Sequence, residues 1–272
     1  MIHNTKHRIS LILILLISTV SCSSVKQTER SDKTLQATLW IQNSAEYEAL
    51  TRTVYEGALD ALDSVIAKNE SVYLNQSSHS EADNLPQAII LDVDETVLDN
   101  SPFQARMIIQ NSTFTPESWD TWVQQADADP IPGVKSFLDA AVNRDIQLFY
   151  VTNREASQEA ATIENLKNVG IYASEDNVLT KNEQPGWTSK KESRRAFIAQ
   201  NYNIIMLIGD DLNDFFPAKE ISQEERASMV ERHHEKWGYQ WFVLPNPVYG
   251  SWDQILSNQE QTPLEQLNPK YK

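Results

Sequence analysis

Cysteine, positive charge and long apolar runs are all scarce in this sequence of 272 residues. The single cysteine, Cys22, excludes an intrachain disulfide. Lys and Arg total 23 against 38 Asp and Glu, so the formal net charge is -15. Because such a surface repels a phosphate backbone, a nucleic acid polymer is not an expected partner. It would repel a small anion too, so any anion site needs a bound cation or a local basic residue.

The N-terminus has the pattern of a targeting segment. Three basic residues, 6–8, precede a mainly apolar run over residues 9–20. That run is too short to cross a bilayer as a helix, but it has the length of a signal-peptide core. We therefore predict a signal peptide over residues 1–21.

Cys22 lies directly after a small residue at the end of the apolar run, as in the lipobox of bacterial lipoproteins. Thr19 departs from that pattern, which usually has Leu there. The placement predicts lipidation of Cys22, the alternative being an incidental free thiol. Residues 22–34 are polar and read as a tether. The mature protein would then be held in the cell envelope by its lipid, and Ser23 indicates the outer membrane.

The remainder alternates between strand and helix patterns. Apolar runs predict strands at 86–92, 146–154, 177–179, 203–211 and 239–246. Helical periodicity or composition predicts helices within 35–75 and at 133–143, 154–168, 190–200 and 222–236. The alternation predicts one α/β domain over residues 35–272, with a Rossmann-like parallel sheet flanked by helices.

One connection is unusually long. Residues 101–132 separate the first strand from the next predicted helix, which exceeds an ordinary strand-to-helix loop. We expect this segment, together with parts of residues 35–80, to form a small helical cap over the carboxyl end of the sheet.

Acidic side chains follow two of the predicted strands. Asp92 and Asp94 come directly after the first strand, where one carboxylate can attack phosphorus and the other can carry a proton. Asp210 and Asp214 follow the fourth strand and supply hard oxygen ligands for Mg²⁺. Taken singly, each cluster also fits a capped or Asx-type turn. Two such strand ends in one parallel sheet favour a shared cation site.

Two further motifs fit phosphate binding. Thr152 and Asn153 end the second strand, where a hydroxyl and backbone N–H groups can bind phosphoryl oxygens, although the pair also caps helices. Residues 190–195 read Lys-Lys-Glu-Ser-Arg-Arg and form the densest basic cluster of the predicted mature chain. Alone, this cluster would fit a solvated helix face.

The order of these motifs resembles the haloacid dehalogenase superfamily. The longer segments ILDVDETVLDNSPF, ESWDTWV, VTNRE, GDDLNDF and FVLPNPVYGSW, behind a lipoprotein leader, resemble the class C acid phosphatases over roughly residues 35–256. These are bacterial outer-membrane lipoprotein 5'-nucleotidases. The resemblance implies a phosphatase domain over 35–272.

The resemblance also implies roles for single residues. Asp92 would be the nucleophile and form a phosphoaspartate, while Asp94 would act as general acid and then as general base. Thr152, Asn153 and a motif lysine would hold the phosphoryl oxygens. Lys191 fits the local pattern best, with Lys190 as its rival.

The metal ligands follow in the same way. Mg²⁺ would be held by the Asp92 carboxylate, the Asp94 backbone carbonyl, Asp210 and, through a water, Asp214. The sequence leaves the role of Asp211 open.

Aromatic residues would recognise the substrate. By the resemblance, Trp119 in the cap and Tyr249 near the C-terminus would stack on the base of a nucleotide, whereas packing in the core is the alternative for Trp119 and the preferred reading for Trp122. Stacking tolerates different bases, so a broad nucleotidase is expected.

The sequence thus predicts a Mg²⁺-dependent acid phosphatase, or 5'-nucleotidase, that hydrolyses nucleoside monophosphates. The alternatives are a non-catalytic binding lipoprotein, such as an adhesin or haem carrier, and a phosphotransferase. The physiological nucleotide, the orientation across the membrane and any dimerisation are left open.

Overall fold

The computed structural model describes residues 34–75, 84–259, 261–262 and 264–267. The predicted signal peptide, Cys22 and nearly all of the tether lie outside these residues. Within the described ranges, no helix combines the length and the apolar character needed to cross a membrane.

A five-stranded sheet forms the centre of the molecule. Its strands are β1 (Gln87–Leu91), β2 (Gln147–Glu155), β3 (Val178–Lys181), β4 (Asn203–Gly209) and β5 (Trp241–Val243). They lie in the order β3-β2-β1-β4-β5, and every pairing is parallel. The chain moves outward from β1 first to β2 and β3, then to β4 and β5. This reversal places a topological switch between β1 and β4, where open α/β sheets bind ligands. The predicted fold class is confirmed.

Both faces of the sheet are buried, as the apolar strand sequences require. Along β1, Ile89 and Leu91 belong to one core cluster, and Ala88 and Ile90 belong to the other. Successive side chains of a strand point to opposite faces, so the buried part of a strand that is covered on both sides, residues 88–91 in β1, is apolar throughout.

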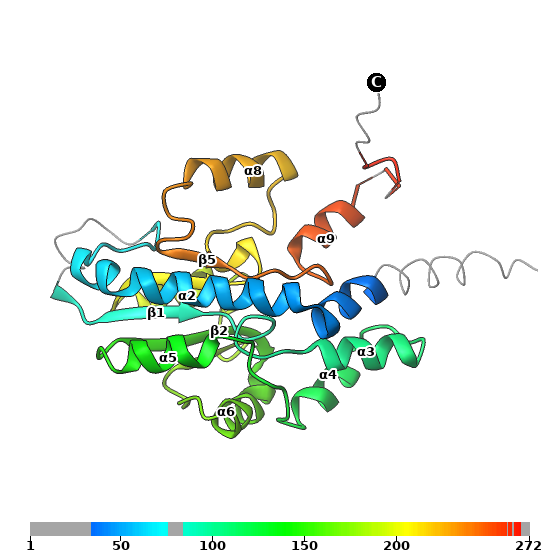
Figure 1. Ribbon diagram of the computed structural model, residues 1–272, viewed down its shortest axis with the longest axis horizontal. Helices are drawn as coiled ribbons and strands as arrows, with labels where there is room; N and C mark the ends of the chain where they lie inside the picture. Colours follow the sequence, from blue (N-terminus) through cyan, green and yellow to red (C-terminus); the bar gives the residue numbers. More distant parts are fainter. Residues whose placement is uncertain (1–33, 76–83, 260, 263, 268–272) are drawn as a thin grey trace, which may run out of the picture.

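Helices cover the two faces unequally (Figure 1). Buried residues of α2 (Ala45–Lys68), α5 (Val134–Val142) and α6 (Glu159–Asn168) share the first core cluster with the sheet. On the other face lies α7 (Glu192–Ile198) with the 3₁₀ turn η3 (Leu212–Asp214). Residues 34–43 form a further helix before α2.

Residues 35–80 were expected to contribute helices to the cap, but most of this segment lies elsewhere. Tyr55, Ala58, Leu62 and Val65 of α2 are buried in the first core cluster. Most of α2 is therefore a layer of the core, because its apolar stripe packs on the sheet.

Two short helices, α3 (Ser101–Ile109) and α4 (Pro116–Val123), occupy the long connection after β1. They lie together beyond the arrowhead end of β1 (Figure 1). Aromatic side chains join them, with the ring centroids of Phe103 and Trp119 5.2 Å apart. The cap segment therefore overhangs the end of the sheet where the acidic motifs begin.

The C-terminal part departs from the predicted lengths. The predicted strand 239–246 is only three residues long as β5, and prolines follow at 245 and 247. Proline cannot donate to a strand ladder, so the run leaves the sheet early. The predicted helix 222–236 becomes α8 (Gln223–Arg232), and α9 (Ser251–Ser257) is a helix that the sequence pattern missed.

Candidate active site

Three carboxylates meet at the switch between β1 and β4. One oxygen each from Asp92, Asp210 and Asp214 lies within 4.8 Å of the other two. Asp92 follows β1, and the other two follow β4, so parallel pairing of these strands brings the motifs together. Residues more than a hundred positions apart thus form one cluster, as predicted from the strand ends.

Gly209 allows the turn after β4 to fold back on itself. The Asp214 carboxylate accepts a hydrogen bond from the Asp211 N–H at 3.0 Å, which closes η3 under the end of the strand. A Cβ atom on residue 209 would lie 2.5 Å from the Cβ of Asp214. Only glycine leaves room for Asp214 in this position.

Lys191 lies inside the acidic cluster. Its Nζ forms an ion pair with Asp92 Oδ1 and lies 2.7 Å from Asp214 Oδ1. The neighbouring Lys190 instead forms an exposed ion pair with Glu220, 2.7 Å away. Of the two candidate lysines, the structure therefore places Lys191 at the acids.

The cluster holds more negative charge than Lys191 neutralises. Burial, reinforced by Asp214 and Asp94 and opposed by Lys191, raises the pKa of Asp92 to about 7. Burial and the nearby Asp92 raise the pKa of Asp210 well above its usual value. Lys191 is also buried, but its two acidic neighbours outweigh that effect and raise its pKa.

These three carboxylates therefore fit a divalent cation by two measures. They are hard oxygen donors close to one another, and Lys191 compensates only part of their buried negative charge.

Asp94 points toward a different set of partners. Its Oδ1 accepts hydrogen bonds from Arg154 Nε at 3.0 Å and Nη2 at 2.8 Å. The Asn100 amide donates to the same oxygen at 2.9 Å. Arg154 and Asn100 are both buried. Arg154 ends the Thr-Asn-Arg motif at residues 152–154, but neither residue was assigned a role, because local sequence does not show which acid a side chain will contact.

Thr152 and Asn153 lie at the end of β2 beside this group. The Thr152 hydroxyl donates to Asp94 Oδ2 at 3.3 Å and accepts from the Arg154 N–H at 3.1 Å. The side-chain oxygen of Asn153 accepts from Arg194 Nη2 at 2.8 Å. Thr152 therefore contacts Asp94, while the side chain of Asn153 is hydrogen-bonded to Arg194 instead.

The basic run 190–195 is mostly interior. Arg194 donates to the backbone carbonyls of Thr152 and Leu179. Arg195 donates at 2.9 Å to the carbonyls of Asn213 and Asp214. Both guanidinium groups are fully buried, so a solvated helix face is the wrong reading of this run. The two arginines brace the loops that carry the site.

Asp211 has a structural task that the sequence left open. Its carboxylate accepts from the Asn213 N–H at 2.8 Å and from the Ser251 hydroxyl at 2.7 Å. The Ser251 N–H donates to it as well, at 2.5 Å. Asp211 therefore fastens the start of α9 to the acidic loop.

The two predicted stacking residues contact different neighbours of the acids. Trp119 is half-buried among cap aromatics, and the Arg154 guanidinium lies 5.6 Å from its ring centroid. The Tyr249 hydroxyl donates to the buried Glu95. Trp122, by contrast, is buried and donates its indole N–H to Asn100 at 2.8 Å.

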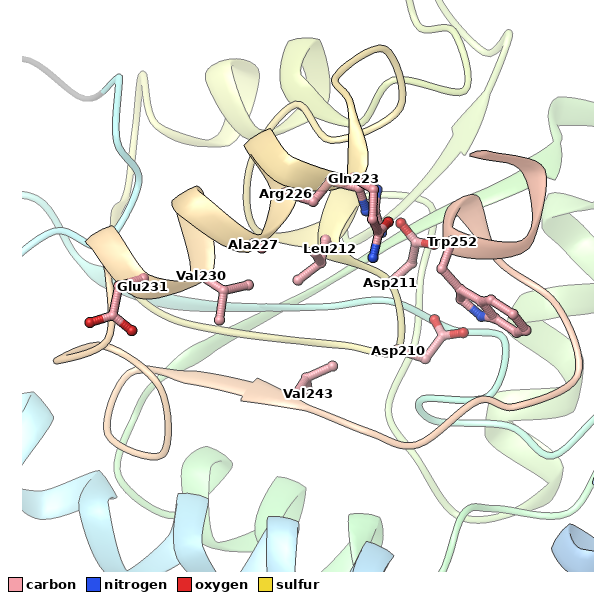
Figure 2. Close-up of a pocket in the computed structure, with 10 residues that line it drawn as sticks. All are labelled: Asp210, Asp211, Leu212, Gln223, Arg226, Ala227, Val230, Glu231, Val243 and Trp252. Carbon is pink, nitrogen blue, oxygen red and sulfur yellow. The ribbon is translucent and has the colours of Figure 1, made fainter. Parts of the chain in front are cut away.

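A cavity of about 390 Å³ adjoins the acidic loop on the β5 side. Figure 2 shows Asp210, Asp211 and Trp252 at one end of it and Glu231 at the other, with α8 along one wall. Its lining does not include Asp92, Thr152 or Lys191. The cavity is thus a neighbour of the carboxylate cluster and does not enclose it.

Comparison with known proteins decides the family. The family model described as HAD superfamily, subfamily IIIB (Acid phosphatase) matches residues 8–252. The chain belongs to this acid phosphatase family. Its activity is that of a phosphomonoesterase, and the family implies a small phosphoester as substrate.

Solved structures agree with this assignment. The class C acid phosphatase from Bacillus anthracis shares 32% sequence identity, with a TM-score of 0.74, over 86% of this chain and 93% of its own. A second structure of that protein, with tungstate bound, gives a TM-score of 0.73 at the same identity. The predicted resemblance to class C acid phosphatases is confirmed.

More distant relatives come from plants. Acid phosphatase 1 of Solanum lycopersicum is 26% identical over 163 residues, which cover 59% of this chain and 57% of that protein. The stem 28 kDa glycoprotein of Glycine max is 23% identical over 211 residues, covering 75% and 77%. Vegetative storage protein 1 of Arabidopsis thaliana is 22% identical over 213 residues, covering 77% and 67%.

Proposed function

We propose that this acid phosphatase is a Mg²⁺-dependent nucleotidase that hydrolyses nucleoside monophosphates through a phosphoaspartate on Asp92. The observation that carries the proposal is the meeting of Asp92, Asp210 and Asp214 within 4.8 Å, with Lys191 between two of them. A buried carboxylate beside a buried ammonium, at the switch of a parallel sheet, suits phosphoryl transfer.

The reaction needs two displacements at phosphorus. In the first, an oxygen of Asp92 bonds to phosphorus, the bond from phosphorus to the ester oxygen breaks, and Asp94 gives its proton to the departing alkoxide. In the second, Asp94 takes a proton from water, the resulting hydroxide attacks phosphorus, and the acyl phosphate bond breaks. Inorganic phosphate leaves, and both carboxyl groups return to their starting states.

Positive charge at the site would come partly from the chain itself. Lys191 already contacts Asp92, so its ammonium can neutralise a phosphoryl oxygen that approaches that carboxylate. The Thr152 hydroxyl and the backbone after it would bind a second oxygen. Together they would offset the repulsion that a chain of net charge -15 exerts on an anionic phosphate ester.

The metal would be Mg²⁺, held by Asp92, the Asp94 carbonyl and Asp210, with Asp214 acting through water. Its carboxylate and carbonyl ligands suit Mg²⁺ in chemical type. When bound, it would supply charge neutralisation between the anionic nucleophile and the anionic ester.

The nucleoside would lie between the cap and the C-terminal segment. Trp119 contacts Arg154 and Tyr249 contacts Glu95, so both rings belong to groups that adjoin the acids, and stacking on these rings would hold bases of different kinds. Asn246 donates to Asp210 Oδ2 at 2.7 Å, which ties the segment of Tyr249 to the acidic loop.

For location, we propose that a lipid on Cys22 anchors the enzyme in the outer membrane. The support is the leader pattern and the polar tether that follows it. Metabolic labelling with a radioactive fatty acid would test this, with Cys22→Ser expected to abolish the label.

Kinetics on a panel of phosphate esters tests the enzymatic proposal. With Mg²⁺ we expect turnover of nucleoside monophosphates and loss of turnover after treatment with EDTA. Asp92→Asn should keep the fold and lose at least about a thousandfold in kcat, because the nucleophile is gone. Retained activity in that variant would remove Asp92 from the mechanism.

A storage or binding role is the second candidate, because plant relatives carry the names of a storage protein and stem glycoproteins. It predicts no turnover of any phosphomonoester with or without Mg²⁺, so the same panel separates the two. Adding an alcohol acceptor tests phosphotransfer. A phosphotransferase would form the phosphorylated alcohol as well as inorganic phosphate, and the ratio of these two products measures the transfer.

A further inference from the structure

Asn100 is a fully buried residue whose side chain has a partner at both ends. Its amide nitrogen donates to Asp94 Oδ1 at 2.9 Å and to Glu95 Oε2 at 3.4 Å. Its amide oxygen accepts the indole N–H of Trp122 at 2.8 Å. Asn100 therefore connects the motif after β1 with the cap helix α4.

The neighbours allow only one orientation of this amide. The indole N–H of Trp122 can only donate, so it must face the amide oxygen of Asn100, and the amide nitrogen must then face the acids. If the amide turned over, its oxygen would face Asp94 and Glu95, and its nitrogen would face the N–H of Trp122. The backbone N–H of Asn100 adds a bond to Glu95 Oε1 at 3.1 Å, which also fixes the main chain.

The two oxygens of Asp94 are treated differently. Oδ1 receives three donors, two from Arg154 and one from Asn100. Oδ2 has one longer contact, to the Thr152 hydroxyl at 3.3 Å. The first oxygen is an anchor, and the second is left beside the residue that we propose to bind phosphate.

We propose that Asn100 is a positioning residue for Asp94, and that Trp122 holds Asn100 in place from the cap. Anchoring Oδ1 fixes the carboxyl rotamer and leaves Oδ2 to face the ester oxygen. The cap then positions the acid for the leaving group as well as binding the substrate. This inference rests on the proposed role of Asp94 as the acid for the leaving group.

Leaving-group dependence tests it. Phenyl phosphate and 2,4-dinitrophenyl phosphate share an aromatic ring, but only phenolate needs a proton to leave readily. Values of kcat/KM cover the steps up to departure of the phenol, so hydrolysis of the intermediate does not enter. For Asn100→Ala we expect a loss of roughly tenfold to a hundredfold on phenyl phosphate and less than about threefold on the dinitrophenyl ester.

Two more variants keep the test sharp if Asn100→Ala fails to fold. Trp122→Phe keeps an aromatic ring and removes the N–H, so the same selective loss is expected at a smaller size, about threefold to tenfold. Trp237→Phe is the matched control, because that indole donates to the Val230 carbonyl at 3.1 Å, outside the site. It should leave both rates unchanged.

Equal losses on the two esters, or no loss, would overturn the positioning role. Asp94→Asn separates this outcome from failure of the mechanism itself. If Asp94→Asn selectively lowers kcat/KM for phenyl phosphate and the Asn100 and Trp122 variants do not, only the present inference fails. If Asp94→Asn also shows no selectivity, the assignment of Asp94 as the acid is wrong.

Discussion

Gly209 and Asp214 show how much a single side-chain atom matters at this site. Asp214 lies under the end of β4 only because residue 209 has no Cβ. In the same loop, the Asp214 carboxylate ion-pairs with Lys191, which in turn contacts Asp92. One added methyl group would therefore disturb Asp214, Lys191 and Asp92 together.

We predict that Gly209→Ala costs about 1–3 kcal/mol of unfolding free energy and most of the activity, because the methyl meets Asp214 in a packed turn. Urea denaturation and kcat measure the two effects. Gly57→Ala in α2 is the matched control, since its Cβ would meet only Phe242 at 3.6 Å. It should be neutral or stabilising by up to about 1 kcal/mol. Similar behaviour of the two variants would contradict the steric explanation.

At the scale of elements, the short cap helices α3 and α4 place Trp119 beside the acids. The helices are too short to be stable alone, so their position depends on packing among Phe103, Phe114 and Trp119. Arg154 contacts both the Trp119 ring and Asp94 and so links this aromatic group to the acidic loop after β1.

We expect Trp119→Ala to raise KM for a nucleoside monophosphate roughly tenfold, because a stacked base loses its partner. KM for a small alkyl phosphate, which has no ring to stack, should change much less. Trp119→Phe keeps a smaller ring and should recover part of the difference. Steady-state kinetics on both esters provide the measurement, and equal changes in the two KM values would exclude base stacking.

At the scale of the whole molecule, buried acidic groups are concentrated at one end of the sheet, in a protein whose net charge is already negative. Asp92, Glu95 and Asp210 all have pKa values raised chiefly by burial, and that of Asp92 reaches about 7. The folded, metal-free protein therefore keeps a proton on Asp92 over a range in which the unfolded chain has lost it. Folding takes up protons in that range, so the free energy of unfolding decreases as pH rises.

We predict that the EDTA-treated enzyme becomes less stable between about pH 4 and about pH 7, and that Mg²⁺ restores stability near neutral pH. Urea denaturation at a series of pH values, with and without Mg²⁺, measures both effects. Asp92→Asn should show a shallower decline, since it removes one of the groups that titrate. A metal-free protein whose stability rises over this range would show that the cluster is not under electrostatic stress.

The amino-acid sequence alone determined which segments form strands along this chain, and that apolar runs lead to Asp92, Thr152 and Asp210. Both the period of the apolar residues and the parallel sheet follow from local patterns, so these features were predictable. The family resemblance was predictable too, because it rests on residue types at fixed spacing. Boundaries were less so, as the shortened β5 and the unforeseen α9 show.

Only the tertiary structure decided that Lys191 rather than Lys190 meets the acids, and that Arg194 and Arg195 are interior. It also revealed the bonds of Asp211 to Ser251 and of Asn100 to Asp94. In each case the partner comes from another element or from a tightly turned loop. Local sequence patterns constrain which elements form, but the direction of a polar side chain depends on what the rest of the chain packs against it.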